Sequence, residues 1–297
     1  MKTHTFSVDE IEGQMLNQLL ISAVSPRPIA LVSSIDNSGK VNLSPFSFFN
    51  IFSFNPPILI FSPSRRSRDN TTKHTYENVL QVPQVSISIV NYAMGQQIAL
   101  ASNRFPKEVN EFEKAGLTPI KSNVVAPPYV GEAPISFECI VDQVLSLGNE
   151  AGSGNLVISK IVKIHINDSC YCPDNLVDLE KLDLIGRMGG SYYCFTRSES
   201  RFEIKTPETP IGIGFDQLPK HALGSDVLTG NILGKLASMA QVPSQESLEI
   251  CRANPEIEII FEQKELGEKI TLLHHKIKDL IKKEQFEEAL CCLFLIQ

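Results

Sequence analysis

Two long runs of β-favouring residues, 135–147 and 156–167, are joined by the glycine-rich turn sequence GNEAGSG at 148–154. Strands of this length around a flexible turn predict a long β-hairpin. Alternation in the second run is expected to place Lys163 and His165 on one face of the strand. The opposite face is expected to carry the apolar residues Leu156, Ile158, Val162, Ile164 and Ile166.

Shorter β-favouring runs precede this hairpin, at 28–35, 41–43, 58–62 and 85–91. The first two flank the turn sequence DNSGK, which predicts a second hairpin. Helical stretches are expected between the strands, at 74–82, 93–102 and 108–115. Many short strands closed by turns favour a barrel over a parallel sheet. The predicted class is therefore mainly β with peripheral helices.

The rest of the chain changes character after residue 205. Proline and glycine are frequent in 206–255, which predicts a loop-rich, ordered extension packed over the barrel, with one helix at 231–240. Apolar residues at helical spacing in 256–297 predict an αα-hairpin whose apolar stripe must pack on the barrel or on another subunit. The expected domains are thus 1–205, 206–255 and 256–297.

The net charge of −7 over 297 residues argues against nucleic acid or an anionic membrane as a partner. The polar start of the chain lacks a signal core, and no apolar run reaches the ~20 residues that span a bilayer. Seven cysteines without a CxxC spacing predict neither a zinc site nor a disulfide framework. His274 and His275 are adjacent on a helix, which is poor geometry for a shared metal ion. We expect a cytoplasmic protein without a bound metal.

The segment 62–75, SPSRRSRDNTTKHT, is basic in an acidic chain. It offers cationic and hydroxyl side chains and leads into a predicted helix N-terminus, and together these favour a phosphate monoester. A solvated basic loop is the alternative. The segment 42–50, NLSPFSFFN, alternates aromatic with amide and hydroxyl side chains, as a flat heteroaromatic with polar edges requires. An ordinary core strand would carry a similar pattern.

These two segments belong to an ordered series of motifs along the chain. The series comprises SPRPIALVSS at 25–34, NLSPFSFFN at 42–50, NPP at 55–57, RDNTTKHT at 68–75, RF at 104–105, FEKAGLT at 112–118, FEC at 137–139 and RMGGSYY at 187–193. In order and spacing, over about residues 20–197, the chain resembles flavin reductase-like proteins with an FMN-binding split β-barrel.

The resemblance implies a homodimer with FMN near the subunit interface. It also implies that 27–34 and 42–50 line the flavin ring and ribityl chain, that 62–75 holds the phosphate, and that 104–105 is a second contact region. Family members usually have an acidic residue where His74 stands. The implied cofactor-binding residues are Arg27, Ser33, Ser34, Asn42, Ser44, Ser47, Phe48, Phe49, Asn50, Ser62, Arg65, Arg68, Lys73, Thr75 and Arg104.

The function that follows from the resemblance is an FMN-binding oxidoreductase, either an NADH- or NADPH-dependent flavin reductase or a flavoprotein that passes electrons to another acceptor. Flavin would perform the chemistry, with backbone N–H groups near 44–47 on the ring edge and no catalytic side chain. His165 is a candidate for a nicotinamide site or an interface position. The alternatives are a non-catalytic FMN-binding or interaction module and, less well supported, a pyridoxine-phosphate oxidase-like enzyme.

Overall fold

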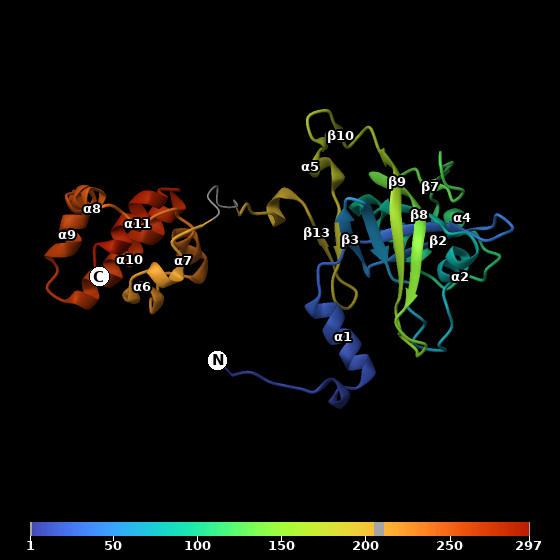
Figure 1. Ribbon diagram of the computed structural model, residues 1–297, viewed down its shortest axis with the longest axis horizontal. Coiled ribbons are helices and arrows are strands. Elements are labelled where there is room, and N and C mark those ends of the chain that lie inside the picture. The colour runs from blue at the N-terminus through green and yellow to red at the C-terminus, as the bar shows by residue number, and fades with distance from the viewer. Residues whose placement is uncertain (1, 205–210, 297) are drawn as a thin grey trace. The chain divides into compact units, whose positions relative to one another are not determined.

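The computed structural model describes residues 2–204 and 211–296 and divides the chain into two compact units (Figure 1). Unit 1 is Met1–Phe202 and unit 2 is Glu203–Gln297. Unit 1 has a β-sheet core with surrounding helices, and unit 2 is helical. This agrees with the mainly β class predicted for the first part of the chain and the helical character predicted for its end.

Unit 1 is built on a seven-stranded sheet in the order β2-β1-β5-β8-β9-β4-β3. Every neighbouring pair in it is antiparallel. The predicted long hairpin is its centre, seen as two long arrows in Figure 1. The strands are β1 (Ala30–Ile35), β2 (Val41–Phe46), β3 (Phe49–Phe54), β4 (Pro57–Phe61), β5 (Gln84–Ile89), β8 (Ile135–Ser146) and β9 (Asn155–Ile166).

The connection between β2 and β3 closes the sheet into a barrel. These strands lie at opposite edges of the sheet order, yet only Ser47 and Phe48 separate them in sequence. Two residues span a few ångströms, so the sheet must curl until its edges approach each other. No hydrogen-bonded ladder joins β2 to β3 within the described residues, so the barrel is split along this seam.

The apolar face predicted for β9 is the more exposed face of the strand. Val162 and Ile164 are 40% and 54% exposed, whereas Val157 and Ser159 are fully buried. The inner face also holds Asn155, whose backbone N–H donates to Ser62 Oγ at 3.1 Å. Because Asn155 and Ser159 are polar although they are buried, hydrophobic alternation alone does not identify the inner face.

Two hydrophobic clusters form the core of unit 1, one inside the barrel around Phe61 and one around Phe112 under the helices. Helices form at all three predicted places. Unit 1 helices are α1 (Gly13–Ala23), α2 (His74–Gln81), α3 (Gly95–Ala101), α4 (Glu111–Ala115) and α5 (Leu179–Leu182), with 3-10 turns at Val8–Glu10, Tyr92–Met94 and Ser198–Ser200. Short strands are β6 (Pro119–Ile120), β7 (Tyr129–Val130), β10 (Tyr171–Cys172), β11 (Leu176–Val177), β12 (Ile185–Arg187) and β13 (Tyr193–Phe195).

Unit 2 contains more helix than the sequence suggested between 206 and 255. The predicted helix at 231–240 is α7, and α6 and α8 lie in the segment expected to be mostly loop. Ser244 caps α8 by accepting from the backbone N–H of Ser247. The helices are α6 (Lys220–Leu223), α7 (Gly230–Ala237), α8 (Gln245–Arg252), α9 (Pro255–Glu262), α10 (Leu266–Lys282) and α11 (Phe286–Phe294), after a 3-10 turn at Phe215–Gln217.

One hydrophobic cluster joins the two segments of unit 2 that were expected to be separate. Leu233 and Leu236 of α7 share it with Leu273 and Ile277 of α10 and Leu293 of α11. The buried part of the predicted stripe is therefore covered within unit 2. Residues 205–210 of the expected extension lie outside the described part of the chain. Among the described helices, none combines the length and apolar character needed to cross a membrane.

Candidate functional site

A polar pocket in unit 1 forms where β2, the start of α2 and the segment after α3 meet. Its lining combines three cations and a histidine with one carboxylate. The residues are Asn42, Ser44, Arg66, Lys73, His74, Thr75, Ala101, Ser102, Asn103, Arg104, Phe105 and Glu111. Five of the predicted cofactor-binding residues, from three separate sequence motifs, are thus brought to one place.

Lys73 is the most informative residue of this pocket. Its side chain is partly buried, and its Nζ lies 4.8 Å from the centre of the Phe46 ring. Burial lowers the pKa of Lys73, and the nearby charge of Arg66 lowers it further. Among the described residues no carboxylate lies within ion-pair distance of its ammonium group. A desolvated cation without an anionic partner favours the binding of an external anion.

The start of α2 adds donors beside Lys73. The helix begins at His74, with Lys73 as its N-cap, and no side chain caps its first turn. Unsatisfied backbone N–H groups and the helix dipole favour negative charge at such an end. Burial also lowers the pKa of His74, which favours its neutral form and leaves the charge of the pocket to its lysine and arginines.

Arg66 and Arg104 extend the cationic side of the pocket. Arg66 is held by its own loop, donating to Thr71 Oγ1 at 3.1 Å and to the carbonyl oxygen of Thr72. Its pKa is lowered by burial and by Arg104. Arg104 pairs with Asp69 at 2.5 Å on the exposed rim. The loop 62–75 is thus a preorganised basic structure.

Buried polar groups in and next to the pocket are hydrogen-bonded to one another. Asn42 donates through Nδ2 to Thr75 Oγ1 at 2.9 Å, which ties β2 to α2. Asn78 donates in the same way to Ser34 Oγ at 3.1 Å. Glu111 accepts from the backbone N–H of Leu43 at 3.0 Å, and burial raises its pKa.

Ten predicted residues lie outside this pocket in the described chain, and several already have internal partners. The guanidinium of Arg27 donates to the carbonyl oxygens of Ile21, Val24 and Met188. Arg65 donates to Asn70. The full set is Arg27, Ser33, Ser34, Ser47, Phe48, Phe49, Asn50, Ser62, Arg65 and Arg68.

The buried and exposed members of that set differ in what they offer a ligand. Ser33 Oγ is buried and has no hydrogen-bond partner among the described residues. Phe48 is 47% exposed and Asn50 is also exposed, so both are accessible at the seam of the barrel. Arg68 is exposed as well.

Sequence reasoning left several lining residues out of the predicted set. Arg66 and His74 lie in the basic loop 62–75 that predicted the site, so both could have been included from the sequence. Ser102, Asn103 and Glu111 enter through the packing of α3 and α4 against β2, which no local pattern reveals. For His165, a candidate for a nicotinamide site or an interface position, the structure shows contacts within unit 1. It binds Glu138 Oε1 at 2.6 Å and stacks on Tyr129.

Metal binding finds no support in the geometry. Within residues 2–204 and 211–296, no group of three or more potential metal-ligating side chains lies close enough to hold an ion. The pocket instead presents cations and neutral donors, the chemistry that suits a phosphate-bearing organic cofactor.

Comparison with known proteins places unit 1 in a family. Residues 22–178 match the flavin reductase like domain. An uncharacterized protein of Aquifex aeolicus is 37% identical over 199 residues, which are 67% of this chain and 99% of that protein. An uncharacterized protein of Halalkalibacterium halodurans is 34% identical over 187 residues, 62% of this chain and 88% of that protein.

Solved structures agree with the fold. Nitrilotriacetate monooxygenase component B from Bacillus cereus superposes with a TM-score of 0.64 at 28% identity, covering 69% of this chain and all of that one. The 2-nitrobenzoate 2-nitroreductase of Pseudomonas fluorescens gives a TM-score of 0.61 at 25% identity, covering 69% of this chain and 97% of that one. The sheet closure, the matching region and these similarities together establish that the chain belongs to the flavin reductase-like family and has its split-barrel fold.

Proposed function

We propose that this chain binds FMN through unit 1 and works as an NADH- or NADPH-dependent flavin reductase, or as a flavoprotein that passes electrons to another acceptor. The observation that carries the proposal is Lys73, a partly buried cation without an anionic partner among the described residues. It lies in a pocket that belongs to the matched family region.

The donor set fits the phosphate of FMN. Lys73, Arg66 and the backbone N–H groups at the start of α2 would hold the phosphate oxygens. Asn42 and Ser44, on β2, line the same pocket and would offer polar groups to the ribityl hydroxyls. A flavin without its phosphate would leave the Lys73 ammonium group without an anionic partner, so the pocket should distinguish FMN from riboflavin.

FMN, when bound, accepts a hydride and delivers electrons one or two at a time. The residues of this chain bind and orient it. The backbone N–H of Ser47, the residue after β2, would donate to the ring edge, and the exposed Phe48 would contact the ring face. Low local dielectric strengthens the Lys73 interaction with a dianion. The similar solved structures carry names of redox proteins, which favours an oxidoreductase over a purely structural role.

The first test replaces Lys73 by Ala. Loss of a charge-assisted contact of about 1.5–3 kcal/mol should weaken FMN binding about 10- to 100-fold and leave riboflavin binding nearly unchanged. Quenching of flavin fluorescence during titration measures both affinities. Lys121→Ala, at an exposed lysine outside the pocket, is the matched control and should behave as the unmodified protein. Equal loss for FMN and riboflavin would contradict the phosphate assignment.

Reduction of bound FMN separates the enzyme from a non-catalytic FMN-binding module. Under anaerobic conditions, NADH or NADPH should bleach the flavin absorption of the loaded protein, and the faster donor is the preferred one. Bound flavin that neither nucleotide bleaches, but that a chemical reductant does, would favour an electron carrier or an interaction module.

A further inference from the structure

Two cysteine thiols meet inside unit 2. Cys251 on α8 and Cys292 on α11 have their Sγ atoms 3.6 Å apart and are 41 residues apart in sequence. They are 7% and 0% exposed. All seven cysteines are thiols, and within the described residues no other two sulfur atoms are in hydrogen-bond contact. Buried thiols usually pack as small apolar groups, so the pairing of two across a helix interface is the distinguishing feature.

The two thiols are not equivalent. The hydrogen bond with Cys292 lowers the pKa of Cys251 although burial opposes this, and it raises the pKa of Cys292 together with burial. Cys251 is therefore the sulfur that becomes thiolate first, with Cys292 as the donor. Two further charged groups act on the pair: Lys276 favours the Cys251 thiolate and Glu288 opposes it. A thiolate is the nucleophilic form of cysteine.

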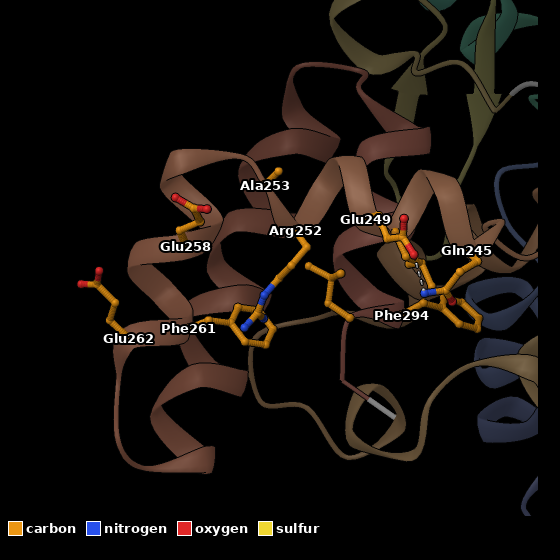
Figure 2. Close-up of a pocket in the computed structure, with 10 residues that line it drawn as sticks. Gln245, Glu249, Arg252, Ala253, Glu258, Phe261, Glu262 and Phe294 are labelled. Atoms are coloured by element: carbon orange, nitrogen blue, oxygen red, sulfur yellow. Dashed lines mark hydrogen bonds between the residues drawn. The ribbon is translucent and has the colours of Figure 1, made fainter.

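The helices that carry the pair also line an open groove (Figure 2). On α8 the groove residues include Leu248 and Arg252, which flank Cys251 in sequence. On α11 they include Phe294, which follows Cys292 by two positions. The groove therefore lies on the helices that carry the pair, although neither thiol lines it.

We propose that Cys251 and Cys292 form a redox-active pair that hydrogen peroxide oxidises to a disulfide. The Cys251 thiolate attacks one peroxide oxygen; the S–O bond forms, the O–O bond breaks and hydroxide leaves. The Cys292 sulfur then attacks the Cys251 sulfenic acid, its proton goes to the departing hydroxyl group, and water leaves. The two thiols lose two electrons in total and the peroxide is reduced to water.

Cys291 provides a matched control on the same helix. It is adjacent to Cys292, but neighbouring helical residues point in directions about 100° apart. It has no sulfur contact with Cys251 among the described hydrogen bonds, and burial raises its pKa. Cys291 and Cys292 are almost equally far from Cys251 in sequence. If only Cys292 forms a disulfide with Cys251, the cause is therefore the tertiary arrangement.

The test treats the full-length protein with hydrogen peroxide and counts thiols after unfolding. Two of the seven thiols should be lost and recovered with dithiothreitol, and peptide mass mapping should find a Cys251–Cys292 crosslink. The crosslink should raise the melting temperature of unit 2 by several degrees, because it constrains the unfolded chain. Cys291→Ser should behave identically. Cys292→Ser should form no disulfide and should accumulate a Cys251 sulfenic acid that dimedone traps.

Retention of all seven thiols in the unmodified protein under conditions that oxidise an exposed cysteine peptide would overturn the proposal. A crosslink through Cys291, or an undiminished crosslink yield in Cys251→Ser, would also overturn it. Thiol counting and mapping of the unmodified protein do not depend on whether a variant folds.

Discussion

At the scale of single residues, a chain of hydrogen bonds in unit 2 determines where the protons of two histidines lie. Ser225 Oγ accepts from the backbone N–H groups of Val227 and Leu228, so its proton is left for His274 Nδ1 at 2.8 Å. His274 then carries its proton on Nε2 and donates to His221 Nδ1 at 2.9 Å. His221 in turn donates to the carbonyl oxygen of Ile296.

This arrangement requires a neutral His274. Burial, together with the neighbouring His221 and His275, lowers its pKa from 6.5 to about 4. The folded form thus binds the proton less tightly than the unfolded chain. Its contribution to stability is present above pH 6.5 and is lost as the pH falls from there toward 4.

We therefore expect the melting temperature of unit 2 to fall when the pH is lowered from neutral to about 5. Circular dichroism at helical wavelengths measures the change. His274→Gln should weaken the pH dependence over this interval. His275→Gln, at the exposed neighbouring residue, should retain it. An equal pH dependence in the His274→Gln variant and the unmodified protein would show that other groups cause the effect.

At the scale of elements, β3 is the edge strand that most needs a partner. Ile51, Phe52 and Phe54 are 59%, 64% and 89% exposed, and β3 pairs only with β4 in the described sheet. Long, apolar, exposed edges are usually covered in a stable protein. The homodimer implied by the family resemblance would cover this strand, and it remains a prediction.

Ile51→Glu should shift the protein from dimer to monomer, because a buried unpaired charge in an apolar interface costs several kcal/mol. Light scattering after size-exclusion chromatography gives the mass. Val124→Glu, at an exposed apolar residue in a loop, is the matched control and should leave the mass unchanged. A monomeric unmodified protein would contradict the prediction outright.

At the scale of the whole molecule, each unit has its own hydrophobic core. The clusters around Phe61 and Phe112 consist of unit 1 residues, and the cluster around Leu273 consists of unit 2 residues. The Aquifex aeolicus relative matches 67% of this chain with 99% of its own length. The length matched, 199 residues, is close to that of unit 1 alone.

Truncation at two positions tests this division. A chain that ends at Phe202 should keep the β-sheet circular dichroism and FMN binding of the full protein. A chain that ends at Pro255 lacks α10 and α11, which supply Leu273, Ile277 and Leu293 to the core. Its residues 203–255 should be cleaved rapidly in limited proteolysis, while unit 1 resists. Protection of 203–255 in that chain would show that this segment folds without the last helices.

Local signals in the sequence were sufficient for most elements and for the family. The turn DNSGK between 28–35 and 41–43 became the β1–β2 hairpin, and GNEAGSG became the turn of β8–β9. The basic loop 62–75 and the segment 42–50 predicted the region of the pocket, because charge and hydroxyl content are visible in a linear chain. The sequence also implied helices in the last forty residues, where apolar spacing is regular.

Only the tertiary structure decided which distant groups meet. The packing of α3 against β2 brings Arg104 into the same pocket as Lys73, although the two are 31 positions apart. The contacts of buried polar groups could not be predicted from the sequence either. Glu138 accepts from the backbone N–H groups of Asn123, Val124 and Val125 and from His165, and these contacts outweigh burial and lower its pKa to about 2.

The physical reason is the same in each case. Propensity and periodicity act between residues a few positions apart, so they specify strands, turns and helices. Packing alone places the groups of three features within a few ångströms of one another: the contact between Cys251 and Cys292, the hydrogen-bond chain from Ser225 to Ile296, and the surroundings of Lys73, which hold no anionic partner among the described residues. The sequence therefore determined the family and the elements of this protein, and the packing of those elements determined its chemistry.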